Sequence, residues 1–210
     1  TAYRRQRQMC IRDRYKPWEW LSLRPGVRTF IVADYDAPIA IPSVLTKFKL
    51  TKHMDLRLSY AYGFRSPTLQ ELYFSFHNDN HDIDGNPDLK AEYSHNITGS
   101  VAYRVLHSEK IHLTTTLSGF YNDFRDKISL AQNVDIPNYN TYYNIDRYKT
   151  VGGSLENSLS WGGLRANLNV SLIGRYNRYA TGDKSMPRFR YSPEAVSYTH
   201  LRAHETRHDL

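Results

Sequence analysis

The chain has 210 residues, of which 23% are charged and 40% hydrophobic, with a formal net charge of +7 and a single cysteine. No run approaches the roughly 18 uninterrupted apolar residues of a membrane helix, which excludes an α-helical membrane protein. A lone cysteine also excludes an internal disulfide or a thiol-ligated metal site.

Both ends of the chain differ from its middle. Residues 4–14 (RRQRQMCIRDR) and 196–210 (VSYTHLRAHETRHDL) resemble translations of the two adapters of transposon-based sequencing libraries. We therefore interpret residues 1–14 and 196–210 as artefacts and 15–195 as one domain; the alternative is a natural basic arm and tail. Leaving the ends out removes Cys10 and lowers the net charge to +3, so we expect no nucleic-acid partner.

Alternating hydrophobicity runs through the middle of the chain. Leu56, Leu58 and Tyr60, for example, alternate with Arg57 and Ser59, the pattern of a strand with one apolar and one polar face. The pattern predicts eight strands, at about 21–32, 42–50, 55–63, 93–105, 110–124, 146–160, 164–178 and, truncated, from 189.

The lengths of the strands and of their connections favour a membrane barrel over a soluble sandwich. Several runs reach about eleven residues, whereas strands of soluble domains average about five or six. Tight turns at 51–54, 106–109 and 161–163 alternate with long polar loops at 64–92, about 125–144 and about 179–188. We predict an all-β, antiparallel meander that forms an open part of a larger transmembrane β-barrel.

The first long loop has ends with clear physical roles. Pro67 ends the preceding strand because it has no amide hydrogen for the sheet, and Thr68 is placed to cap a short helical turn through Glu71. We expect Arg65 to anchor the loop by pairing with Glu71 or Glu92, although contact with a ligand is an alternative.

The same loop carries two sequence motifs, YAYGFRSPTLQELYF at 60–74 and GNPDLKAE at 85–92. Together they resemble TonB-dependent outer-membrane receptors, with Ser66 and Ala91 as small departures. The residues that match the family motif are Phe64, Arg65, Pro67, Glu71, Asn86, Pro87 and Leu89.

The resemblance implies a receptor of the Gram-negative outer membrane that takes up a scarce bulky ligand. A ferric siderophore is the leading expectation for that small-molecule metal chelate, with haem or cobalamin as alternatives. It also implies outer-membrane lipid around the barrel and a TonB partner that acts through a plug domain missing from this fragment. A passive porin or adhesin barrel is the rival class.

Two histidines, His77 and His81, lie between the motifs. Because haem receptors of this family carry a functional histidine in this interval, the resemblance makes either one a candidate axial ligand. A solvated polar loop is the alternative, and a calcium site built from Asp79, Asp82 and Asp84 is a third interpretation.

A second group of candidates lies in the Asn- and Tyr-rich segment 133–148. Tyr139, Tyr142 and Tyr143 offer rigid amphipathic surface for a chelate, while packing against neighbouring loops is the alternative. Four arginines on the polar strand faces suit an acidic plug or an anionic chelate, or pairing with acids such as Glu156: Arg57, Arg104, Arg165 and Arg175.

No nucleophile elbow, zinc-protease helix or phosphate loop occurs. We therefore expect no enzyme activity, no metal site and no resident cofactor, with haem or a ferric chelate present only as transported ligand.

Overall fold

The computed structural model describes residues 7–31, 38–78, 82–108, 110–132, 139–176 and 187–201. Within them the chain is almost entirely β-strand, with one short helix, α1 (Leu69–Tyr73). The strands are β1 (Arg7–Arg12), β2 (Tyr15–Trp18), β3 (Leu21–Ile31), β4 (Ile41–Lys49), β5 (Met54–Arg65), β6 (Ser75–His77), β7 (Asp82–Asp84), β8 (Glu92–His107), β9 (Ile111–Gln132), β10 (Tyr139–Trp161), β11 (Leu164–Tyr176) and β12 (Phe189–Leu201).

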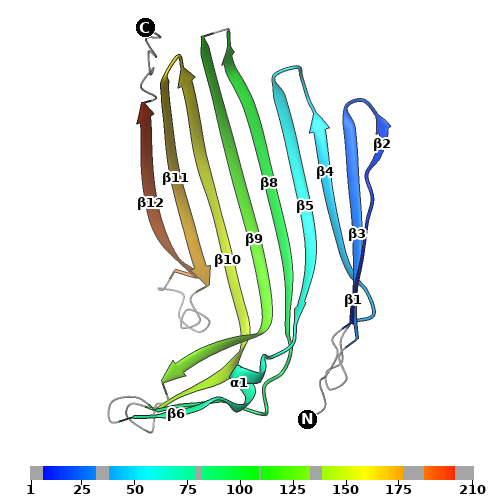
Figure 1. Cartoon of the computed structure of the whole chain (residues 1–210), viewed down its shortest axis with the longest axis vertical. Helices are drawn as coiled ribbons and strands as arrows, with labels where there is room; N and C mark the ends of the chain where they lie inside the picture. Colours follow the sequence, from blue (N-terminus) through cyan, green and yellow to red (C-terminus); the bar gives the residue numbers. More distant parts are fainter. Residues whose placement is uncertain are drawn as a thin grey trace, which may run out of the picture.

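All these strands join one sheet whose main path runs β1-β3-β4-β5-β8-β9-β10-β11-β12. Neighbours on this path are antiparallel, and in the described residues the end strands β1 and β12 do not pair with each other. Figure 1 shows the resulting curved wall, with tight turns at one end and α1 and β6 at the other. The fold confirms the predicted open meander.

All eight predicted strands are present, with boundaries within two residues of the prediction except at the end of β9 and the start of β10. Four short strands, β1, β2, β6 and β7, were not predicted. β7 pairs with β10 in parallel, which departs from an entirely antiparallel meander. β1 and the end of β12 lie in the adapter-like segments. Strand pairing does not test where a sequence comes from, so the interpretation of residues 1–14 and 196–210 as artefacts stays a prediction.

The predicted loop at about 125–144 is wrong at both of its ends. β9 continues to Gln132 and β10 begins at Tyr139, and the two strands stay in register from Trp161 out to Asn140. The segment is rich in polar residues and therefore looks like a loop in the sequence. Its backbone nevertheless continues the hydrogen-bonded pairing of the two strands. Asp126, within β9, has a φ of +52°. Figure 1 shows the outer ends of β9 and β10 turning toward β6.

The register separates an outer face from an inner face. On the outer face Leu58 lies opposite Gly99, and Val101 opposite Leu117, which is 59% exposed. The inner face carries small polar residues such as Ser59, opposite Thr98, their hydroxyls in contact. An exposed apolar face this extensive requires apolar surroundings. Among the described residues no helix has the length and hydrophobicity to cross a membrane.

Candidate functional site

Arg65 is the centre of an ion-pair cluster at the long-connection end of the wall. Its Nη1 donates to both carboxylate oxygens of Glu71, at 3.0 and 2.9 Å, and its Nη2 donates to Glu92 Oε2 at 3.1 Å. The same Glu92 oxygen accepts the Ile128 amide at 3.1 Å. The cluster of Arg65, Glu71 and Glu92, called the anchor cluster below, therefore ties β5, α1, β8 and β9 together.

The helix that holds Glu71 starts as the sequence predicts. β5 ends at Arg65 and Pro67 is buried; Thr68 Oγ1 then accepts the Glu71 amide at 3.2 Å, and Glu71 Oε2 accepts the Thr68 amide at 2.8 Å. Burial by itself raises the pKa of the Glu71 carboxyl. The hydrogen bonds from the Thr68 backbone and the Arg65 side chain outweigh that effect and hold the pKa below its ordinary value.

A small apolar core adjoins the anchor cluster. Leu72, Leu89 and Ile128 are buried together, Leu89 only 3% exposed, and Tyr142 packs against them. The core contains residues from α1, the second motif and the outer part of β9, which explains why β9 stays ordered beyond the predicted strand end. Tyr142 is thus a packing residue here.

The second motif is fixed to β10 by side-chain amides. Asn86 Nδ2 donates to the Tyr142 carbonyl at 2.9 Å, while Asn86 Oδ1 accepts the Asp88 amide; Pro87, between them, is exposed. Asn144 accepts the Lys90 amide at 2.8 Å and donates to the Lys90 and Asp126 carbonyls at 3.0 and 2.7 Å. In the sequence, Asn144 stands out only as a member of the Asn- and Tyr-rich segment 133–148.

Gly85 has no room for a side chain. A Cβ at this position would lie 2.6 Å from backbone atoms of Leu72 and Tyr73. The Gly85 amide donates to the Phe74 carbonyl and the Asn86 amide to that of Glu71. This close approach lets the second motif lie directly against the end of α1.

His77 lies on β6 between two carboxylates. Its Nδ1 is 3.1 Å from Asp82 Oδ1, and its Nε2 is 2.9 Å from Ser75 Oγ and 3.3 Å from Asp84 Oδ1. Although 57% exposed, the imidazole therefore has both nitrogens engaged. His81 and Asp79 fall outside the described residues, and within the described ranges no group of three or more His, Cys, Asp or Glu is placed to hold a metal ion.

The three candidate tyrosines do not form one surface. Tyr139 lies opposite Asp82 in the parallel β7–β10 pair and hydrogen-bonds Asp84, which joins it to the His77 cluster. Tyr142 packs on the apolar core, whereas Tyr143 is exposed at 36%. Phe64 lies opposite Tyr93, their rings 5.4 Å apart.

The inner-face arginines differ in their environments. Arg104 Nη2 lies 3.0 Å from Asp55, which Lys47 also approaches at 3.2 Å. Pairing with an acidic neighbour is thus confirmed for Arg104, with Asp55 as the acid. Arg57 lines a depression of about 330 Å³ with inner-face hydroxyls and Phe120. In the register Arg165 lies opposite Ser160, Arg175 opposite Thr150, and Glu156 opposite Asn169.

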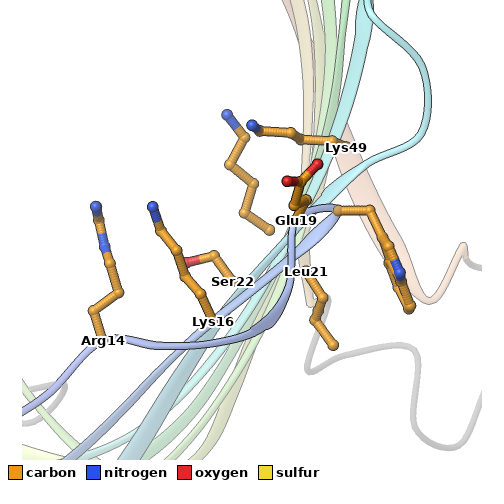
Figure 2. A pocket seen from close by; sticks show the side chains of 8 residues that line it. Arg14, Lys16, Glu19, Leu21, Ser22 and Lys49 are labelled. Atoms are coloured by element: carbon orange, nitrogen blue, oxygen red, sulfur yellow. The ribbon is translucent and has the colours of Figure 1, made fainter.

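A second depression, of about 160 Å³, lies near the turn that follows β2. Figure 2 shows Arg14, Lys16 and Lys49 pointing to one side together with Glu19, and Leu21 pointing to the other. Arg14 belongs to the adapter-like segment, so we assign this depression no role.

The sequence of this chain matches a known protein family and several curated proteins. The model of the family described as "TonB dependent receptor-like, beta-barrel" matches residues 2–204. The chain is 30% identical over 141 residues to hemoglobin and hemoglobin-haptoglobin-binding protein C of Haemophilus influenzae, covering 63% of this chain and 13% of that protein. It is 36% identical over 98 residues to hemoglobin-haptoglobin utilization protein B of Neisseria meningitidis serogroup C, covering 45% and 12%.

Solved structures agree on the fold. The siderophore receptor PirA of Pseudomonas aeruginosa superposes with a TM-score of 0.59 at 17% identity, over 93% of this chain and 46% of that one. The FrpB iron transporter of Neisseria meningitidis gives a TM-score of 0.56 at 22% identity, over 80% and 25%. The chain spans between 7% and 15% of the length of the curated relatives it matches.

Proposed function

Because the chain belongs to the TonB-dependent receptor-like β-barrel family, we propose that it is part of the wall and outer loops of a receptor that acquires iron from haem-carrying proteins. Members of this family are outer-membrane transport receptors of Gram-negative bacteria rather than enzymes. Membership decides against the passive porin or adhesin class.

One observation carries the choice of ligand. Eight curated proteins match the chain, and all of them are named for haemoglobin or haemoglobin-haptoglobin binding or utilization. The siderophore receptors among the structural neighbours are below 25% identical and are evidence for the fold alone. We therefore place haem ahead of the ferric siderophore expected from the sequence, and cobalamin behind both.

The geometry around His77 supports this proposal. Asp82 engages Nδ1 at 3.1 Å, the arrangement that fixes the ring and raises the basicity of the other nitrogen in histidine metal ligands. To ligate haem iron, Nε2 must leave Ser75 and Asp84, and both contacts are exposed ones that water readily replaces. Haem is cargo here, bound at the outer surface before uptake.

Uptake itself belongs to the proposal as well. In this family energy reaches the receptor through TonB and a plug inside the barrel, so we propose TonB as partner. The inner face of this wall, lined with hydroxyls and Arg57, offers the plug a hydrogen-bonding surface.

The decisive experiment uses iron-starved cells that produce the full-length receptor containing this chain. We expect growth on haemoglobin as sole iron source, loss of that growth when the receptor gene is deleted, and loss again when TonB is removed. Growth on a ferric siderophore but not on haemoglobin, with the same gene dependence, would contradict the haem assignment and restore the siderophore alternative.

A further inference from the structure

The strand register orders the outer face into rows that run across the strands. At the short-turn end one row contains Ile111, Trp161 and Leu164. Toward the long connections another row contains Tyr60, Ile97, Tyr121 and Val151. From β5 to β11 the rows between them are apolar apart from Thr115 and Asn157, which bond to each other, and aromatic rings stand in both limiting rows. On β4, Thr46 adds a hydroxyl to the row of Leu58.

The distance between these two rows matches the thickness of the hydrocarbon layer of a membrane. Val151 and Trp161 are ten residue steps apart along β10. At about 3.4 Å per residue and a tilt of about 40°, they span about 26 Å along the membrane normal. The apolar band of an outer-membrane barrel is about 25 Å tall and bounded by aromatic girdles. The row of Val151 is therefore the outer limit of the hydrocarbon, on the side of the long loops.

Cations gather in the two rows directly beyond that limit. The first of them places His95 opposite Asp123 and Asp123 opposite Lys149; the second places Tyr93 opposite Arg125 and Arg125 opposite Arg147. By strand alternation these side chains point outward, on the same face as Val151 and Tyr121. They stand at the level of lipid headgroups.

Among the residues that the structure describes, only part of this positive charge is balanced by acidic side chains. Lys149 Nζ lies 3.2 Å from Asp123 Oδ2 and 3.0 Å from the Tyr121 hydroxyl, and Arg147 Nη2 lies 3.4 Å from the same Asp123 oxygen. One carboxylate thus serves two cations. Among the described residues, the neighbouring acids Asp126 and Asp146 form no ion pair with these cations.

The juxtaposition of Arg125 and Arg147 points to an anion. Residues directly opposite on antiparallel strands have Cβ atoms about 5 Å apart, and like charges there destabilise the pair. Both arginines are exposed. A bound phosphate removes the repulsion because guanidinium groups hold its oxygens through charge-assisted, bidentate hydrogen bonds.

We propose that Arg125, Arg147 and Lys149, the outer cation patch, bind the phosphate-bearing headgroup of a lipid in the outer leaflet. The neighbouring Tyr93 and Tyr121 provide rigid amphipathic contacts at the same level, as interfacial aromatic residues do. The site is independent of the transported ligand, since it lies on the opposite face of the wall from the lumen.

The test uses the full-length receptor purified in detergent, with diphosphorylated lipid A as probe and its dephosphorylated form for comparison. Native mass spectrometry measures the lipid bound. We expect the variant Arg125→Gln/Arg147→Gln to bind the phosphorylated lipid at least about tenfold more weakly, since it loses the charge-assisted hydrogen bonds of both guanidinium groups. Arg165→Gln/Arg175→Gln, with the same change of two charges on the inner face, is the matched control.

Heat-modifiable migration in gels reports whether each variant barrel is folded. If the glutamine variant does not fold, Arg125→Lys/Arg147→Lys, which retains both charges, is compared with the single variant Arg147→Gln. Equal binding by these variants and the unsubstituted protein, or equal binding of the dephosphorylated lipid, would overturn the proposal. Displacement of the lipid by inorganic phosphate at the same concentration would also overturn it, because the site would then select free phosphate.

Discussion

Arg65 and Glu92 are register partners on β5 and β8 and also an ion pair, with Nη2 and Oε2 3.1 Å apart. The backbone ladder and the side-chain contact thus close the base of the long loop at one point. Because Glu71 engages the other guanidinium nitrogen, the first residues of the loop are held there as well.

Substituting Arg65 by Ala tests this closure. We expect Glu71 and Glu92 to repel each other and the loop to open more easily, by about 1–2 kcal/mol, a modest figure because Arg65 is 41% exposed. Hydrogen exchange of the amides in α1 and β6 measures the opening. Arg165→Ala is the control, and unchanged exchange in Arg65→Ala would contradict the anchoring role.

The lowered pKa of Glu71 predicts loosening of α1 in acid. A carboxyl whose folded pKa is depressed contributes stability that is present above its ordinary pKa of 4.5 and is lost as the pH falls through the folded value. We expect amide exchange at Glu71 and Leu72, corrected for its intrinsic pH dependence, to increase below about pH 4.5. Glu71→Gln should be looser at neutral pH and should lose this pH dependence; an identical profile in both proteins argues against it.

The small core predicts unequal effects for two leucines. Leu89→Ala removes a side chain that is 3% exposed, and we expect a loss of about 2–4 kcal/mol in the stability of the loop and the outer part of β9. Leu69→Ala, on α1 but 74% exposed, should change stability by less than about 0.5 kcal/mol. Limited proteolysis of the two variants distinguishes them, and equal cleavage rates would rule out the core.

The haem proposal predicts a specific change at His77. In the full-length receptor, His77→Ala should weaken haem binding and shift the Soret band, because the iron loses an imidazole ligand. Asp82→Asn should weaken binding less, since it removes only the partner of Nδ1. His53→Ala, in a turn at the opposite end of the wall, is the control. If His77→Ala leaves affinity and Soret band unchanged, the ligand is another residue.

Most strands of the wall can be predicted from the sequence. When apolar and polar residues alternate over ten residues or more, the pattern determines which side chains share a face and limits how neighbouring strands can pair. Leu56, Leu58 and Tyr60 illustrate this, as does the capping pair of Thr68 and Glu71, whose chemistry is local. Long-range pairings are different. Nothing in the sequence places Asp82 beside Tyr139, and Asn144 bonds to Lys90 only because the second motif folds back on β10.

The prediction for the outer part of β9 was wrong for a related reason. Residues 125–132 look like a loop by composition, yet Ile128 is buried against Leu72 and Leu89, which are distant in sequence. A burial that depends on three separate segments leaves no periodic trace in any one of them.

The closure at Arg65 and Glu92 also separates the loop from the wall in design terms. Since the strand register and the ion pair fix both ends, the stretch between Pro67 and Ala91 is a cassette. We expect its middle, between Phe74 and Gly85, to tolerate changes of length or sequence while β5 and β8 keep their alignment, because the anchoring contacts of Glu71, Leu72, Asn86 and Leu89 lie outside that part. One barrel scaffold can in this way display loops of different shape while the base of the loop, at Arg65 and Glu92, stays in the same place.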